Sequence, residues 1–307
     1  AYHVAIFHLF THAFFKALLF LGSGSVIHSM NDEQDIRNMG NLWKKMPFTW
    51  ISMIVGTLAL TGFPLLSGYY SKDAIIESAY LSHTNIGYFA TAVGIITALL
   101  TAIYSWRLIF KTFHGKFNNQ KISKSDIHES GLSITLPLFV LILGSVFSGF
   151  LFKDSLIGYH YTEFWGSSIL LLKQFSHEQV PIWLLYLTPS LVTLSIPLSY
   201  YLFIKNVEIL DKIKSKNKTL YTFLLNKWYF DEIYEFIFTK PIKAIGLFFW
   251  RSGDIKTIDR FGPDGISKLV KIISNKATKL QSGYIFDYAF VMLLGFSLLL
   301  TFFIIYK

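Results

Sequence analysis

The chain has 307 residues, of which 52% are hydrophobic and only 15% are charged, against about a quarter charged in ordinary soluble domains. It contains no cysteine, which excludes disulfides, thiolate-held iron–sulfur clusters and zinc-thiolate sites within it. Its net charge of +9 does not indicate nucleic-acid binding, because the basic residues lie between apolar segments rather than in one basic domain. The composition therefore predicts an all-α, polytopic membrane protein.

Apolar runs recur at lengths near the roughly 20 residues that a helix needs to cross a bilayer. Each run can satisfy its backbone hydrogen bonds internally as a helix. We expect about six spans, at 1–28, 48–78, 86–110, 132–152, 182–204 and 284–306. The sequence opens inside an apolar pattern without a start methionine or basic leader, so we expect a fragment whose upstream spans are missing.

The distribution of Lys and Arg between the loops predicts the orientation of these spans. If residue 1 lies outside, the inside loops begin at about 29, 111 and 205. The first two of these loops carry seven basic residues: Arg37, Lys44, Lys45, Lys111, Lys116, Lys121 and Lys124. The outside loops carry only Lys153 and Lys173, which agrees with the positive-inside rule.

The segment 205–283 is neither a span nor a plain loop. Ile266, Leu269 and Ile273 fall on one helical face, whereas Lys268 and Lys271 fall on another, which is the pattern of an amphipathic helix. An interfacial helix held by lipid is the common form of such a segment. Its length favours a lateral helix that extends over neighbouring membrane subunits.

Two proline sites should shape this lateral helix. Pro241 and the pair Gly262-Pro263 are expected to kink or interrupt it, because proline lacks a backbone donor and clashes with the preceding turn.

Three ionisable residues lie within the first span. His8, His12 and Lys16 are spaced i, i+4, i+8 and therefore share one helical face, with Thr11 nearby. Imidazole can accept and donate a proton on its two nitrogens, and a buried lysine can switch between charged and neutral forms. The pattern favours a proton path, although core histidines with a snorkelling Lys16 would be the structural alternative.

A second ionisable site, Lys72-Asp73, follows Gly62, Pro64 and Gly68 within the second span. Proline and glycine at these positions predict a helix broken in mid-membrane, and broken helices mark ion paths in transporters. Glu77 could close the outer end of this site. The structural alternative is an interfacial Lys-Asp pair at the outer end of the helix.

These motifs resemble one membrane family. The stretch His8 to Phe20 (HLFTHAFFKALLF) resembles the signature helix of the L-type, antiporter-like subunit of NADH:quinone oxidoreductase, respiratory complex I. Gly68 to Asp73 (GYYSKD) resembles that family's discontinuous helix, and Trp228 to Tyr234 (WYFDEIY) resembles its C-terminal region. The resemblance covers essentially the whole chain.

The resemblance implies a role for each candidate residue. Lys16 would be the central-axis lysine, His8 and His12 its flanking histidines, and Lys72 with Asp73 the outward exit pair. These five residues would translocate protons, coupled to electron transfer in partner subunits.

The resemblance also implies a division of the chain. Residues 1–110 would be the last three helices of the antiporter-like core, and 111–204 two additional transmembrane helices. Residues 205–283 would be the lateral helix, and 284–307 the C-terminal anchoring helix. The inward half-channel would come from the missing N-terminal part of the same subunit.

The resemblance implies no cofactor in this chain, because partner subunits would carry FMN, the iron–sulfur clusters and the quinone site. The expected partners are other membrane subunits of complex I, especially antiporter-like sister subunits along the lateral helix, together with lipid. We expect a bacterial inner membrane from the Lys-, Ile- and Asn-rich composition, rather than a mitochondrial one. The large subunit of a multisubunit sodium/proton antiporter and a non-pumping structural fragment stay open as alternatives.

Overall fold

The computed structural model describes residues 2–119, 126–169 and 180–306 of the chain. Ala1 and the loop residues Lys121, Lys124 and Lys173 lie outside the described residues. The described part consists of helices and connecting segments without a strand, which confirms the all-α prediction. The chain divides into two compact units, residues 1–216 and 217–307.

Five helices are long and apolar enough to cross a membrane, in the part of the chain that the structure describes. They are α1 (Tyr2–Ser29), α4 with its terminal π-helical turn (Asn85–His114), α5 (Leu132–Leu156), α7 with its terminal π-helical turn (Ile182–Lys205) and α13 (Ile285–Ile305). They correspond to five of the six expected spans. The π-helical turns are Phe110–His114 and Tyr201–Lys205.

The remaining expected span, 48–78, is divided into α2 (Pro47–Thr61) and α3 (Ser67–Tyr80). Gly62 ends α2 with a φ of 83°, a left-handed conformation that glycine adopts without steric cost. Pro64 lacks a donor, and Leu65 also has a positive φ, 73°, so the backbone cannot continue as one helix. The predicted mid-span break is present in the structure.

The broken halves remain in close contact after the break. A Cβ atom at Gly68, in the first turn of α3, would lie 1.8 Å from the carbonyl oxygen of Ala59 in α2. Only glycine permits this approach, since no side chain fits between the two backbones. This close contact fixes the position of the first turn of α3. The same helix carries Lys72 and Asp73.

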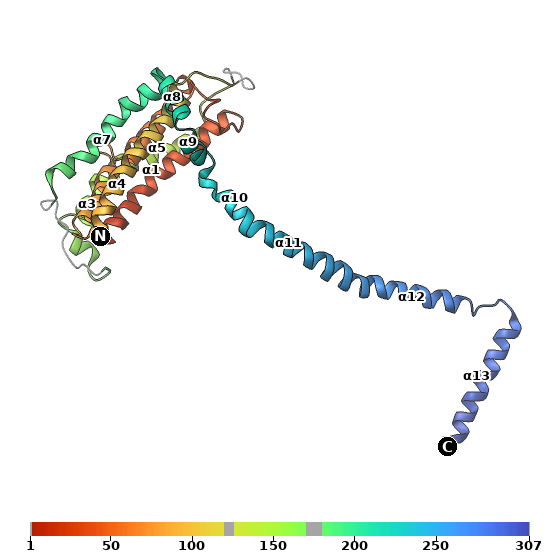
Figure 1. Ribbon diagram of the computed structural model, residues 1–307. Coiled ribbons are helices and arrows are strands. Elements are labelled where there is room, and N and C mark those ends of the chain that lie inside the picture. Colours follow the sequence, from red (N-terminus) through yellow and green to blue (C-terminus); the bar gives the residue numbers. More distant parts are fainter. Residues whose placement is uncertain (1, 120–125, 170–179, 307) are drawn as a thin grey trace. The chain divides into compact units, whose positions relative to one another are not determined.

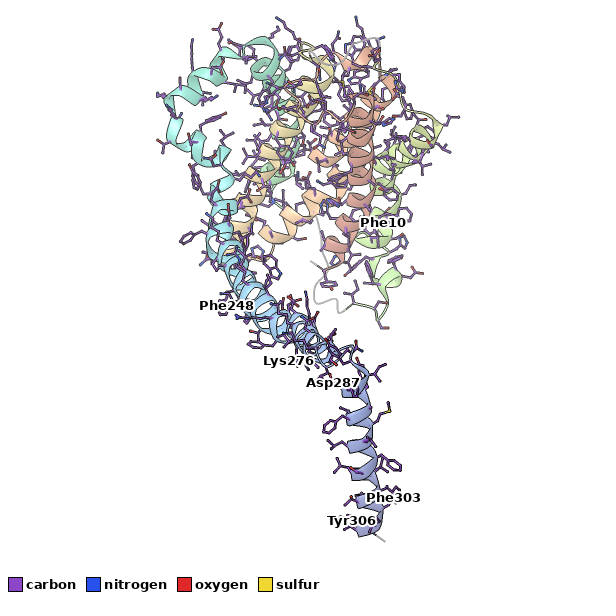
Figure 2. The ribbon with its side chains drawn as sticks, turned by 90° about the vertical axis from the view of Figure 1, so that its right-hand side faces the viewer. Phe10, Phe248, Lys276, Asp287, Phe303 and Tyr306 are labelled. Atoms are coloured by element: carbon purple, nitrogen blue, oxygen red, sulfur yellow. The ribbon has the colours of Figure 1, made fainter. Side chains whose placement is uncertain are left out.

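In the first unit, α1 packs against α2, α3 and α5, and α4 packs against α7 (Figure 1). One face of α1 is fully buried at Phe7, Thr11, Phe15 and Leu18, spaced by three and four residues as a helix requires. Phe10, labelled in Figure 2, packs edge-to-face on Phe152 of α5 with ring centroids 5.1 Å apart. These contacts hold the ionisable face of α1 in a set orientation.

A carboxylate caps the N-terminus of α2. Glu129, in the segment before α5, accepts hydrogen bonds from the backbone amides of Phe48 at 2.8 Å and Thr49 at 3.2 Å. A negative charge is favourable at this end of a helix, because the first amides lack intrahelical partners and the helix dipole is positive there. This contact ties two distant segments together at one end of the bundle.

The first unit also contains three shorter helices between or after the long ones. They are the 3₁₀-helix Leu42–Lys44, α6 (Tyr161–Trp165) and α8 (Glu208–Lys216).

The second unit is a succession of helices. They are α9 (Lys218–Leu225), the 3₁₀-helix Lys227–Tyr229, α10 (Phe230–Tyr234), the π-helix Glu235–Thr239, α11 (Lys240–Phe248), the π-helix Phe249–Asp259, α12 (Pro263–Thr278) and α13. Figure 1 shows α10, α11 and α12 following one another along one nearly continuous path.

The two proline sites of this unit differ. Gly262 has non-helical angles, φ −82° and ψ −107°, directly before Pro263, so the expected interruption is present there. Pro241 is instead the second residue of α11 and follows a π-helical turn. The wider turn allows the helix to continue where an α-helix would lose a hydrogen bond.

The side chains of the second unit project outward. Phe248, Lys276 and Phe303, labelled in Figure 2, extend from their helices, and α9 to α13 contain no buried residue among those described. Leu269 and Ile273 on the apolar face of α12 are 56% and 57% exposed. The expected amphipathic segment is thus helical, and its apolar face is open.

Candidate functional site

The three ionisable residues of α1 share one face, as the spacing predicted. The imidazole rings of His8 and His12 have centroids 5.7 Å apart, and His12 lies edge-to-face on Phe15 at 5.3 Å. The Nζ atom of Lys16 lies 6.0 Å from the centre of the Phe20 ring. All three ionisable side chains are half-buried.

Ser71 joins this face of α1 to α3. Its hydroxyl lies 3.0 Å from Nδ1 of His8 and 2.7 Å from the hydroxyl of Thr11. Both Ser71 and Thr11 are fully buried, so these bonds form away from solvent, where hydrogen-bonded partners are needed to offset burial. Sequence patterns pointed to Thr11 but not to Ser71, whose position directly before Lys72 was the available signal.

The directions of these hydrogen bonds follow from counting protons. Thr11 donates its single hydroxyl proton to the carbonyl oxygen of His8 at 3.1 Å, so Ser71 must donate to Thr11. Ser71 can then only accept from His8, which places the histidine proton on Nδ1. Nε2 of His8, which keeps its lone pair, is then the ring nitrogen that can exchange a proton.

Lys72 lies at the helix break. Its Cδ atom would be 3.7 Å from a Cβ atom at Gly62, so its side chain passes beside the residue that ends α2. The predicted juxtaposition of Lys72 with the broken backbone is therefore present. Because Lys72 directly follows Ser71, it also lies next to the connection with His8.

Asp73 and Glu77 form the far end of the site. Both carboxylate oxygens of Asp73 are buried without a hydrogen-bond partner among the described residues. With Glu77, Tyr69 and Lys153, Asp73 lines a pocket of about 290 Å³. The Lys153 Nζ atom, from α5, lies 5.6 Å from the Tyr70 ring. From its sequence position, Lys153 was expected only as part of an outside loop.

The ionisable groups form an uninterrupted series from α1 to the outer pocket. Successive members lie close enough to interact electrostatically, in the order Lys16, His12, His8, Lys72, Asp73 and Glu77. The series changes helix at the Ser71 hydrogen bonds. Chemically, groups of these kinds can hold, accept and pass protons.

Three further basic side chains, His28, Arg107 and His114, lie near the inside ends of the expected spans, where interfacial anchors are found. Trp50 donates its indole proton to Nε2 of His114 at 3.1 Å, and Arg107 lies 5.9 Å from the Phe203 ring. His28 lies in the last turn of α1. None of these three belongs to the series above.

Two families match consecutive parts of the chain. Residues 104–305 match the family described as NADH dehydrogenase subunit 5 C-terminus. Residues 1–101 match the family described as NADH:quinone oxidoreductase/Mrp antiporter, TM.

Curated relatives are similar along nearly all of this chain. NADH-ubiquinone oxidoreductase chain 5 of Marchantia polymorpha is 38% identical over 312 aligned positions, which cover 98% of this chain and 46% of the relative. The chain of the same name from Arabidopsis thaliana is 39% identical, with 98% and 46% covered. NADH-quinone oxidoreductase subunit L of Rickettsia bellii is 39% identical, with 99% and 47% covered. The chain thus spans less than half the length of these relatives.

The Ser71 bridge can be tested by removing its hydroxyl. Ser71→Ala should destabilise the purified chain by about 1–3 kcal/mol, because His8 and Thr11 would lose a buried partner. Ser78→Ala is the matched control on the same helix, since the Ser78 hydroxyl is buried without a hydrogen-bond partner among the described residues. Thermal unfolding in detergent should show a lower midpoint for Ser71→Ala alone, and equal midpoints would contradict the bridge.

Proposed function

The chain belongs to the family of the NADH dehydrogenase subunit 5 C-terminus, and we propose that it is part of a proton-translocating membrane subunit of NADH:quinone oxidoreductase. The observation that carries this proposal is the continuous series of ionisable groups from Lys16 to Glu77, which crosses from α1 to α3 at Ser71. Ionisable groups at membrane depth are expensive and are kept for function.

In this proposal His8 transfers protons through Nε2. The Ser71 hydroxyl holds Nδ1–H, so the second ring nitrogen is the one that exchanges protons with the other groups of the series. His12 and Lys16 supply protons along the same face of α1. A half-buried lysine suits this role, because small changes in nearby charge alter the balance between its ammonium and amine forms.

Lys72 and Asp73 act as the exit pair in this proposal. Lys72 receives the proton beside the broken backbone, and Asp73 offers a carboxylate in the pocket that Glu77 and Lys153 also line. The open pocket would let water accept the proton. Under the orientation that the basic loops predict, this pocket faces the outside.

We propose that partner subunits carry FMN, the iron–sulfur clusters and the quinone site. For the clusters, this agrees with a chain that has no cysteine to hold them on thiolates. A segment corresponding to the part of the relatives that this chain does not span would cover the half-buried face of His12 and Lys16 in this proposal. Sister antiporter-like subunits and lipid would cover the lateral segment. We propose a bacterial inner membrane as the location, on the composition.

A multisubunit sodium/proton antiporter is the second candidate function. The family that matches residues 1–101 includes such antiporters in its description. Residues 104–305 match the family of subunit 5, which favours the redox-driven enzyme. Dependence of transport on NADH oxidation distinguishes the two.

Lys16 provides the test of proton transfer. In the complete enzyme, Lys16→Ala should lower proton pumping and quinone reduction together, by up to about 10²-fold if no other group replaces it. Lys16→Arg should fail as well, because Arg keeps a charge but cannot release its proton at working pH. Proton uptake by inside-out vesicles oxidising NADH measures both rates.

Lys45 gives the matched control for that test, since it is exposed in the loop before α2. Lys45→Ala and Lys45→Arg should leave both rates unchanged. Full activity of Lys16→Arg would mean that charge alone matters at this position, and the relay would be rejected.

The lateral segment provides the test of assembly. Leu269→Glu with Ile273→Glu should weaken the complex, because carboxylates would be buried against partner subunits at several kcal/mol. Asn275→Glu with Thr278→Glu adds the same charge to the polar face of α12 and serves as the control. Native gels of solubilised membranes should show loss of the full-size complex only for the first pair, and an intact complex would mean that the apolar face lies on lipid.

A further inference from the structure

A second pocket, of about 520 Å³, lies at the other end of the first unit from Asp73. It is formed where the π-helical turns at the ends of α4 and α7 meet the loop before α2. Four of its lining residues are basic or donor groups: Arg37, Lys111, His114 and Lys116. Its volume is within the range of ordinary ligand sites, about 300–1,000 Å³.

Two contacts fix the backbone and one side chain of this pocket. Arg37 donates from Nε to both carboxylate oxygens of Asp35, at 2.9 and 2.8 Å, and this contact lowers the pKa of Asp35 to about 2. A Cβ atom at Gly40 would lie 2.4 Å from the backbone oxygen of Lys116, so the loop lies directly against the chain that carries Lys116. The backbone that carries Lys116 is therefore packed directly against the loop that carries Arg37.

The pocket has a surplus of positive charge and donors. Neither Lys111 nor Lys116 has an ion-pair partner among the described residues, whereas Asp35 already neutralises Arg37. His114 accepts from Trp50 on Nε2, so its proton is on Nδ1 and can be donated to a ligand. This set of groups fits an anionic ligand with several acceptor oxygens.

The surroundings of the pocket are those of a membrane interface. Lys111 lies in the final turn of the apolar helix Asn85–His114, and Phe203 and Ile204 contribute apolar lining. Leu100 and Tyr104 are 58% and 54% exposed, and helical spacing puts them on the same face of α4 as Lys111. On this face an apolar stripe formed by Leu100 and Tyr104 is followed by Arg107, which lies on the Phe203 ring, and then by Lys111 at the basic pocket.

We propose that this pocket binds the phosphodiester headgroup of an anionic membrane phospholipid, whose acyl chain lies along Leu100 and Tyr104. Lys111, Lys116 and His114 contact the phosphate oxygens. Basic pockets between spans on the inside face are a recognised form of anionic lipid site, and free phosphate would not use the apolar stripe. The site is independent of the proton path, because it shares no residue with it.

The test compares lipid retention by charge variants. The complete chain is stripped of lipid in detergent and titrated with phosphatidylglycerol or phosphatidylcholine, and bound lipid is counted by native mass spectrometry. Lys111→Gln with Lys116→Gln should weaken phosphatidylglycerol binding about 25-fold, or about fivefold for each charge near the surface, and leave phosphatidylcholine binding unchanged. Lys44→Gln with Lys45→Gln, exposed in the segment before α2 and outside the pocket lining, should change neither. Equal phosphatidylglycerol binding by the pocket variant and the wild type would overturn the proposal.

Two further arms distinguish a built lipid site from a diffuse basic surface and from a site for soluble phosphate. Gly40→Ala keeps every charge but displaces the loop from Lys116, so it should also weaken phosphatidylglycerol binding; wild-type affinity would indicate a diffuse basic surface and overturn the proposal. Inorganic phosphate should not displace the bound lipid at equal concentration, and displacement would assign the pocket to soluble phosphate. Single Lys111→Gln, expected to lose about fivefold, gives the answer if the double variant does not fold.

Discussion

The contact between Ser71 and the pair His8 and Thr11 is the interaction that joins the two halves of the site. It is the place where two helices exchange buried hydrogen bonds, and it fixes both the register of α3 against α1 and the protonated nitrogen of His8. Without this contact, the group His8, His12 and Lys16 on α1 and the Lys72-Asp73 pair on α3 would be two separate clusters. A buried hydroxyl is a small group, but in a low-dielectric environment its hydrogen bonds are strong and directional.

The helix break makes this contact possible. If α2 and α3 formed one continuous span, Ser71 and Lys72 would be fixed by the helical phase of residues 47–61. The left-handed Gly62 and the close approach at Gly68 allow α3 to take its own direction while its first turn stays packed on α2. The same break brings the Lys72 side chain beside Gly62, the residue that ends α2. The fold and the proposed proton path thus depend on the same few residues.

Much of the fold and of the candidate site could be predicted from local sequence patterns. Span positions follow from the length of apolar runs. The shared face of His8, His12 and Lys16 follows from their four-residue spacing, and the break follows from Gly62 and Pro64. Contacts between distant segments could not be predicted in this way. The Ser71 bridge and the Glu129 cap on α2 depend on how distant segments meet, and a single serine or glutamate carries no periodic signal. The roles of the five site residues stay predictions.

Proton exit through Asp73 is the step on which the proposed function depends most. It is measured by the proton-to-electron ratio together with the quinone reduction rate of the complete enzyme carrying Asp73→Asn, reconstituted in sealed vesicles. The amide keeps the size of the carboxyl group but cannot take up a proton. Pumping and quinone reduction should therefore fall together, while the assembled complex stays intact. Wild-type pumping at the wild-type reduction rate would contradict exit through Asp73.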